Sequence, residues 1–298
     1  REALPAKEHV EGEPVHDAPI PPLTWLGEKL RTLGHDVHVI APAQIMQMGD
    51  GSYIPVDGAP RRVDILYRFF ELFDLANVKG ADGIFNAVEA GTLTLTPPMK
   101  AFQEEKLGLA LLHHPQLAEF WKENLPEDHH EALFRIVPQT WIMEKTELPP
   151  TAVLHAPGVN GRPIREWTEL AEASQRERNL IIKASGFHET AWGARSVTLG
   201  SDVSRDEWLE AIEDALNPEN ETFHVMQAYH KPSRLTHPVY ADDGSIVPAD
   251  GRVRLCPYFF VDNDTVELSG ILSTFCPADK KIIHGMSDAA LLPCHLVP

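Results

Sequence analysis

One continuous stretch constrains the fold of this chain more than any other. Residues 179–183 (Asn-Leu-Ile-Ile-Lys) form a short apolar run that ends in a lysine, which is typical of a buried strand. A loop with two glycines follows over 184–194, and 196–199 predicts a returning strand. Residues 204–216 predict a helix, and 223–229 predict a third strand. Strands joined by a loop and by a helix favour an α+β fold.

The patterns outside this stretch predict further helices and strands. An amphipathic helix over 23–33 is stopped by Gly34 and followed by a strand at 37–40, an order typical of an α/β unit. The Gly- and Pro-rich residues 49–60 predict a turn. Further helices are predicted at 99–114, 116–124 and 166–177, and further strands at 63–70, 93–96, 252–261, 265–275 and 281–283, the last three in an antiparallel sheet.

The charge balance of the chain limits its partners. Lys and Arg total 26 against 44 for Asp and Glu, which gives a formal net charge of −18. Because so acidic a chain repels phosphate backbones and anionic lipid, we expect neither nucleic acid nor a membrane surface as a partner. The three cysteines are too few and too widely spaced for a disulfide framework. No signal peptide or long apolar run is visible, so we expect a cytoplasmic protein.

Lys183 is the first candidate for chemistry, because it closes an apolar strand and faces a glycine-containing loop. An ammonium in that position can contact the phosphates of a nucleotide while loop amides approach from the other side. The loop contains Ser185, Gly186 and Gly193, and Arg195 at its end is suited to a developing negative charge. The alternative is a simple hairpin whose lysine extends its stem to solvent.

Four further residues carry weaker signals. Gln227 lies where the strand 223–229 turns polar, so its side chain and nearby backbone could bond an adenine edge. Lys106 lies on a predicted helix beside two glutamates, a pattern that also fits an ordinary surface lysine. Arg252 and Arg254 alternate on a strand and so share one face. Two guanidinium groups on one face need an anion or a carboxylate between them, which allows a phosphate site or a salt-bridge patch.

Several common active-site motifs are missing from the sequence. It contains no GxxxxGK[ST], no HExxH, no GxSxG and no GxGxxG after a strand. These absences disfavour a P-loop, a zinc hydrolase, a serine hydrolase elbow and a dinucleotide-binding domain. A hydrolase would need a nucleophile beside a histidine, and Cys276 with His284 is the pair to check.

Three stretches together resemble the circularly permuted ATP-grasp family, related to glutathionylspermidine synthetase. Residues 63–68 (Val-Asp-Ile-Leu-Tyr-Arg) look like the family's "VDxxYR" strand, and 96–106 look like its proline- and lysine-containing helix. Residues 181–197, followed by Met226-Gln227, look like its lysine loop and hinge strand, although Ala184 stands where the family has proline. The resemblance covers residues 23–295, and its strength lies in the order of the motifs.

The resemblance implies an ATP-grasp fold, in which two α+β lobes with antiparallel sheets enclose a nucleotide cleft, preceded by an N-terminal α/β segment. It implies five regions: an entry segment at 1–22, an α/β region at 23–96, a helical region at 97–178, a nucleotide-binding lid at 179–235 and a C-terminal sheet at 236–298. The residues implied to bind ATP are Lys106, Lys183, Ser185, Gly186, Gly193 and Gln227, with Arg195 and Arg254 acting on the transferring phosphate.

The implied activity is ATP-dependent amide-bond formation. A small-molecule or peptide carboxylate would be activated as an acyl phosphate and passed to an amine, with ATP and Mg²⁺ as cofactors. The family's Glu-x-Asn pair, which binds Mg²⁺, is expected upstream of residues 23–295. Asp64 and Glu71 are the alternative Mg²⁺ ligands within that range. A protein that keeps the fold and binds nucleotide without catalysis is the second expectation.

Overall fold

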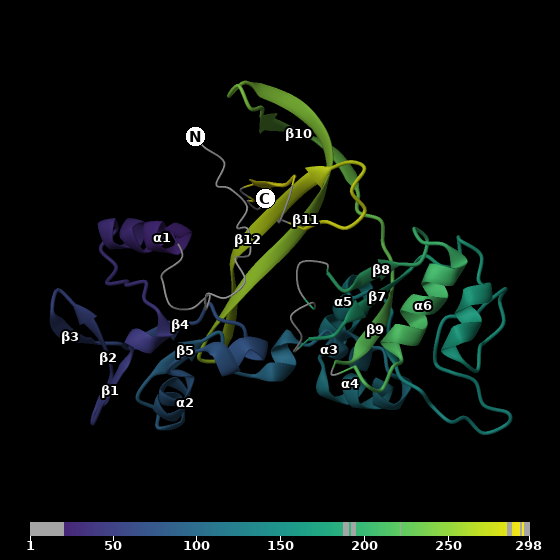
Figure 1. The fold of residues 1–298 in the computed structure, drawn as a ribbon, viewed down its shortest axis with the longest axis horizontal. Helices are drawn as coiled ribbons and strands as arrows, with labels where there is room; N and C mark the ends of the chain where they lie inside the picture. The colour runs from purple at the N-terminus through teal and green to yellow at the C-terminus, as the bar shows by residue number, and fades with distance from the viewer. Residues whose placement is uncertain are drawn as a thin grey trace. The chain divides into compact units, whose positions relative to one another are not determined.

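A computed structural model describes residues 21–186, 191, 195–220, 222–284, 288–292 and 294 of the chain (Figure 1). The chain divides into two compact units, Arg1–Glu105 and Lys106–Pro298. Both units mix helices with strands, and most paired strands run antiparallel. The fold class is therefore α+β, as the sequence predicts. Among the described residues, no helix combines the length and the apolar composition needed to span a membrane.

The first unit combines a small antiparallel sheet with a parallel strand pair. Strands β4 and β5 pair in parallel, and α2 lies between them in the chain. Ile84 on α2 is fully buried at the centre of this unit's apolar core. The elements of the unit are α1 (Pro21–Thr32), η1 (Pro42–Gln44), β1 (Met46–Met48), β2 (Gly51–Val56), β3 (Ala59–Arg62), β4 (Ile65–Tyr67), η2 (Leu72–Asn77), α2 (Ala81–Glu89), β5 (Thr94–Thr96) and η3 (Ala101–Glu104).

Two local predictions in the first unit are wrong. Residues 37–40 form no strand. The helix α1 ends at Thr32, and Gly34 shortly after it has the left-handed conformation that suits glycine at a helix end. Residues 49–60, predicted to be a turn, contain β2 and the first half of β3, and these two strands pair antiparallel. Pro55 and Pro60 are partners in this register. They are tolerated because Pro60 lies on the edge strand β3 and Pro55 lies beyond the residues of β2 that pair with β1.

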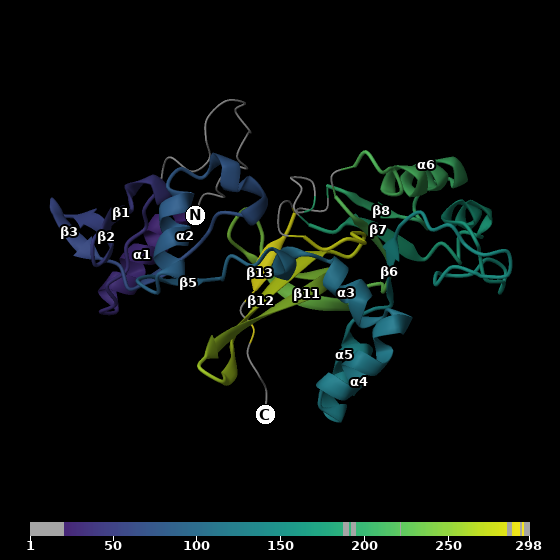
Figure 2. The same ribbon diagram turned by 90° about the horizontal axis from the view of Figure 1, so that it is seen from below.

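The second unit is built on two antiparallel sheets. The first has the strand order β6-β9-β7-β8, and α6 covers one of its faces (Figure 2). Side chains from that face and from α6 form a large apolar core around Trp208. The elements of the second unit up to the last strand of this sheet are α3 (Leu107–Leu112), η4 (Pro115–Leu117), α4 (Ala118–Asn124), α5 (Glu127–Ile136), β6 (Thr140–Met143), η5 (Trp167–Glu172), β7 (Leu180–Ala184), β8 (Val197–Leu199), α6 (Arg205–Ala215) and β9 (His224–Ala228).

The second sheet has the order β10-β11-β12-β13 and is dominated by one long hairpin. Strands β11 and β12 pair along most of their length, with a register shift between Tyr258 and Phe259. The bounds are β10 (Arg234–Tyr240), β11 (Ile246–Asp262), β12 (Thr265–Pro277) and β13 (Ala290–Leu292). The antiparallel C-terminal sheet is thus confirmed, whereas the predicted strand at 281–283 is not present.

Two predicted helices of the chain are shorter than expected. The stretch 99–114 splits into η3 and α3, and it spans the boundary between the two units. The stretch 166–177 contains only the 3₁₀ helix η5. Its buried face carries Trp167 and Leu170, whose packing in the core fixes the segment without a full α-helix.

Candidate functional site

Lys183 lies near the end of β7, on the face of the sheet that does not carry the apolar core. Leu180 and Ile182 of the same strand pack into the core under α6. Because side chains alternate along a strand, Ile181 and Lys183 point to the opposite face. The register pairs Lys183 with Val225 on β9 and with Val197 on β8. The apolar alternation of β7 therefore places a half-buried ammonium on the second face of the sheet.

The ammonium of Lys183 begins a chain of hydrogen bonds across three strands. Lys183 Nζ donates to Gln227 Oε1 at 2.8 Å, and Gln227 Nε2 donates to Thr140 Oγ1 at 2.8 Å. The hydroxyl of Thr140 donates in turn to the carbonyl of Pro138 at 2.8 Å. Thr140 and Gln227 are register partners and are only 1% and 7% exposed. Both polar groups of the Gln227 side chain are thus bound within the protein.

Lys106 joins the same region from the start of α3. Its backbone N–H and its Nζ both donate to the carbonyl of Ser185, at 3.1 and 3.0 Å, and Nζ also donates to the carbonyl of Ala191 at 2.8 Å. The buried hydroxyl of Ser185 accepts a hydrogen bond from the N–H of Leu107 at 2.8 Å. Ser185 therefore connects the start of α3 to the segment that follows β7.

The two lysines influence each other electrostatically. The pKa of Lys183 lies below the usual lysine value, first because burial disfavours the charged form and second because the ammonium of Lys106 repels a further positive charge. None of the described carboxylates contributes to this shift. The two ammonium groups are therefore close enough for each to disfavour the charge of the other.

The other residues of the predicted loop are placed less fully. The carbonyl of Gly186 accepts a hydrogen bond from Thr222 Oγ1 at 2.7 Å. Arg195 is exposed, just before β8. Gly193 lies outside the described residues. The roles predicted for the glycines and for Arg195 stay predictions.

Arg252 and Arg254 occupy alternate positions of β11 in the second sheet. Arg252 is buried and donates to the carbonyls of Ala278, at 2.8 Å, and Pro232. Arg254 is exposed and donates to the carbonyl of Ile283 at 3.1 Å. In the described part of the chain, these hydrogen bonds of Arg252 and Arg254 run to backbone oxygens and not to carboxylates. They therefore do not support the prediction of a salt-bridge patch.

The residues proposed as alternative metal ligands lie in the first unit and form no cluster. The side chain of Asp64 is 88% exposed and lies 4.0 Å from Arg62 Nε. Glu71 has a raised pKa, mainly through burial and then through the nearby charge of Glu104. Within the described ranges, no three His, Cys, Asp or Glu side chains gather as a metal site would require. We therefore assign Mg²⁺ no ligands among the described residues, and its binding stays a prediction.

The hydrolase alternative is disfavoured by the geometry of Cys276. This cysteine is fully buried, and its Sγ donates to the backbone carbonyl of His284 at 3.4 Å. A nucleophilic thiol needs an exposed position next to a base rather than a bond to a carbonyl.

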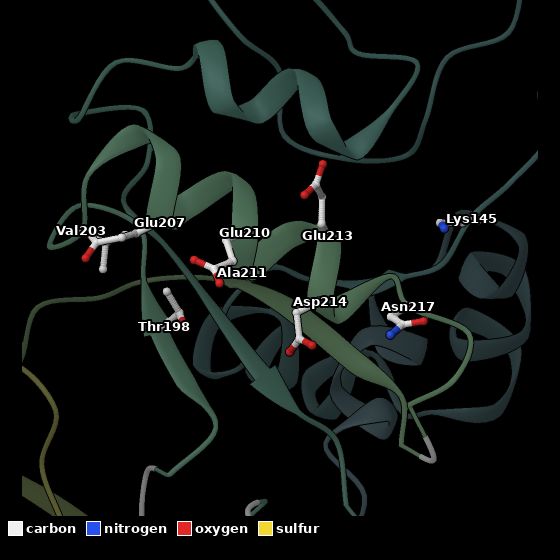
Figure 3. A pocket seen from close by; sticks show the side chains of 9 residues that line it. All are labelled: Lys145, Thr198, Val203, Glu207, Glu210, Ala211, Glu213, Asp214 and Asn217. Carbon is white, nitrogen blue, oxygen red and sulfur yellow. The ribbon is translucent and has the colours of Figure 1, made fainter.

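A separate cavity of about 620 Å³ lies on the α6 side of the first sheet (Figure 3). Thr198, one of its lining residues, is the register partner of the core residue Ile182, so this cavity is on the face opposite Lys183. Carboxylates from α6 dominate its lining, which consists of Lys145, Thr198, Val203, Glu207, Glu210, Ala211, Glu213, Asp214 and Asn217. Such a surface repels phosphate, so it is not the nucleotide site that the sequence predicts.

Sequence reasoning missed Thr140. Threonine carries no signal of its own at the start of an apolar strand, and only the register of β6 against β9 sets it opposite Gln227. No protein-family model and no curated protein sequence matches the chain.

Proposed function

We propose that the second unit binds the phosphates of a nucleotide at Lys183 and Lys106, and that the protein is an ATP-dependent carboxylate–amine ligase. The observation that carries the proposal is the half-buried ammonium of Lys183, whose pKa is lowered by burial and by a second ammonium. Keeping two like charges close together costs free energy that a bound polyanion offsets.

The residues around Lys183 are suited to hold phosphate oxygens. Lys106 is fixed by two backbone carbonyls, and Lys183 is fixed by Gln227, so neither ammonium needs to be ordered when the ligand binds. A lysine acts on phosphate as a point charge with three donors, and Lys183 uses one of them for Gln227. Preorganised cations of this kind favour a ligand with several negative oxygens.

The ligase activity rests on the resemblance to the ATP-grasp family, with which the α+β class and the two antiparallel sheets of the second unit are compatible. In the proposed reaction, a substrate carboxylate oxygen attacks the γ-phosphorus of ATP and ADP leaves. An amine then attacks the carbonyl carbon of the acyl phosphate, inorganic phosphate leaves, and an amide forms. Arg254 is proposed to stabilise the charge of the transferring group. Mg²⁺ supplies charge neutralisation in such reactions, but none of these steps is assigned to it.

A protein that binds nucleotide without turnover would use the same lysines. Phosphate release from ATP, measured with a panel of amino acids, small peptides and polyamines, separates the two functions. Release that depends on one acid and one amine identifies the ligase, and nucleotide binding without release identifies the second function.

Replacing Lys183 by alanine should weaken ATP binding about 10- to 100-fold, because a charge-assisted hydrogen bond to phosphate is lost. Isothermal titration calorimetry of the 298-residue chain with ATP measures this effect. Lys145→Ala is the matched control, since Lys145 lines the acidic cavity on the opposite face of the sheet. Equal ATP affinity in the two variants would remove the central assignment.

The affinity for ATP should also fall with rising pH earlier than an ordinary lysine would allow. The pKa of Lys183 is lowered, so the free protein loses this positive charge at a pH below the usual range for lysine. Lys183→Arg keeps its charge throughout, so its ATP affinity should stay constant over the interval in which that of the unsubstituted protein falls. Parallel pH profiles for the two proteins would contradict the assignment of the titrating group.

A further inference from the structure

The hydrogen bonds around Gln227 allow only one orientation of its side-chain amide. The single proton of the Thr140 hydroxyl is donated to the carbonyl of Pro138. Towards Gln227 the hydroxyl can therefore only accept, and this requires the Nε2 end of the amide. The Oε1 end is then turned to Lys183, where it accepts from the ammonium. If the amide were reversed, two donors would face each other at Lys183 and two acceptors would face each other at Thr140.

We propose that Thr140 is a positioning residue for the phosphate-binding ammonium of Lys183, acting through the orientation of the Gln227 amide. The inference rests on the proposed nucleotide site, because Lys183 is the group that would touch the phosphate. Thr140 itself is buried behind Gln227 and bonds only within the protein. Its hydroxyl keeps an acceptor oxygen on the ammonium and so holds the ammonium in position before any ligand arrives.

The effect of Thr140 on the Gln227 amide is strong because both side chains are buried. The amide of Gln227 is almost fully buried, so water cannot replace a lost partner. In a Thr140→Val variant the shape of the side chain is kept but the acceptor is gone. The amide then either keeps an unpaired N–H or rotates its N–H towards Lys183. Either change weakens the hydrogen bond between Gln227 and the ammonium of Lys183.

The test compares Thr140→Val with Thr140→Ser in ATP titrations of the whole chain. The valine variant should bind ATP about tenfold more weakly, in line with the loss of a buried hydrogen bond that supports a charged group. The serine variant keeps the hydroxyl, so its affinity should stay within about twofold of the unsubstituted protein. Thr198→Val is the matched control, because it makes the same change in the same sheet on the opposite face. Equal affinities in the two Thr140 variants would overturn the proposal.

A spectroscopic measurement keeps the test valid if the valine variant does not fold. In the unsubstituted protein, the side-chain amide protons of Gln227 should exchange with water far more slowly than those of exposed glutamines. Exchange as fast as that of an exposed glutamine would overturn the positioning role. If the unsubstituted protein bound no ATP, the proposed function would fail. Slow exchange at Gln227 and an altered Lys183 Nζ resonance in Thr140→Val would still support the coupling of Thr140 to Lys183 through Gln227. The two failures are thus distinguishable.

Discussion

Replacing Trp208 by alanine is expected to lower the free energy of unfolding of the second unit by about 3–5 kcal/mol. Trp208 lies on α6, is completely buried and belongs to the core between this helix and the first sheet. The substitution removes a large apolar side chain and leaves a cavity that the neighbouring side chains cannot fill. Because Ile182 and Met226 in that core flank the positions of Lys183 and Gln227 on their strands, ATP binding should weaken as well.

The matched control on the same helix is Glu210→Ala, whose side chain is exposed and whose unfolding free energy should change by no more than about 0.5 kcal/mol. Trp208→Phe should cost far less than Trp208→Ala, since it keeps an aromatic ring and removes an indole N–H that has no partner in the described part of the chain. Urea titration followed by circular dichroism measures all three variants. A loss below about 1 kcal/mol in Trp208→Ala would show that α6 does not depend on this core.

The local elements of the second unit are predictable from the sequence because each carries a strong pattern. The apolar run at 179–183 corresponds to β7, and the capping residue Ser204 stands directly before α6. The side chain of Ser204 accepts from the N–H of Glu207, as the spacing predicts. Patterns of this kind depend on neighbouring residues alone. Elements that follow from such patterns can therefore be predicted without the tertiary structure.

The arrangement of the candidate site is less predictable because it depends on contacts between distant segments. The bond between Lys183 and Gln227 and the approach of Lys106 to Ser185 both join residues far apart in the chain. The sequence singles out each of these side chains, but it does not contain the register that makes Thr140 a partner of Gln227. The short strands β2 and β3 were missed for a related reason, since their prolines and glycines also fit a turn.

Arg68 should be as important to the first unit as Trp208 is to the second. Its guanidinium is buried, pairs with the carboxylate of Glu104 and donates to the carbonyls of Phe70, Pro97 and Pro98. Arg68→Met leaves three carbonyls without the guanidinium donor and leaves a partly buried carboxylate without its cationic partner. We expect a loss of about 3 kcal/mol in the free energy of unfolding of this unit. Hydrogen exchange at the amides of α2 reports on the first unit separately.

Two further variants test whether the loss of stability in Arg68→Met comes from the buried ion pair. Arg62→Met is the matched control, because the Arg62 side chain is 53% exposed and lies 4.0 Å from Asp64, a contact of little value in solvent. The double variant Arg68→Met/Glu104→Met should recover part of the loss, since it also removes the carboxylate that Arg68→Met leaves uncompensated. Recovery would identify the unpaired charge of Glu104 as a main cost of losing Arg68. A double variant less stable than Arg68→Met would instead mean that Glu104 is held mainly by the N–H of Leu72, to which it also bonds.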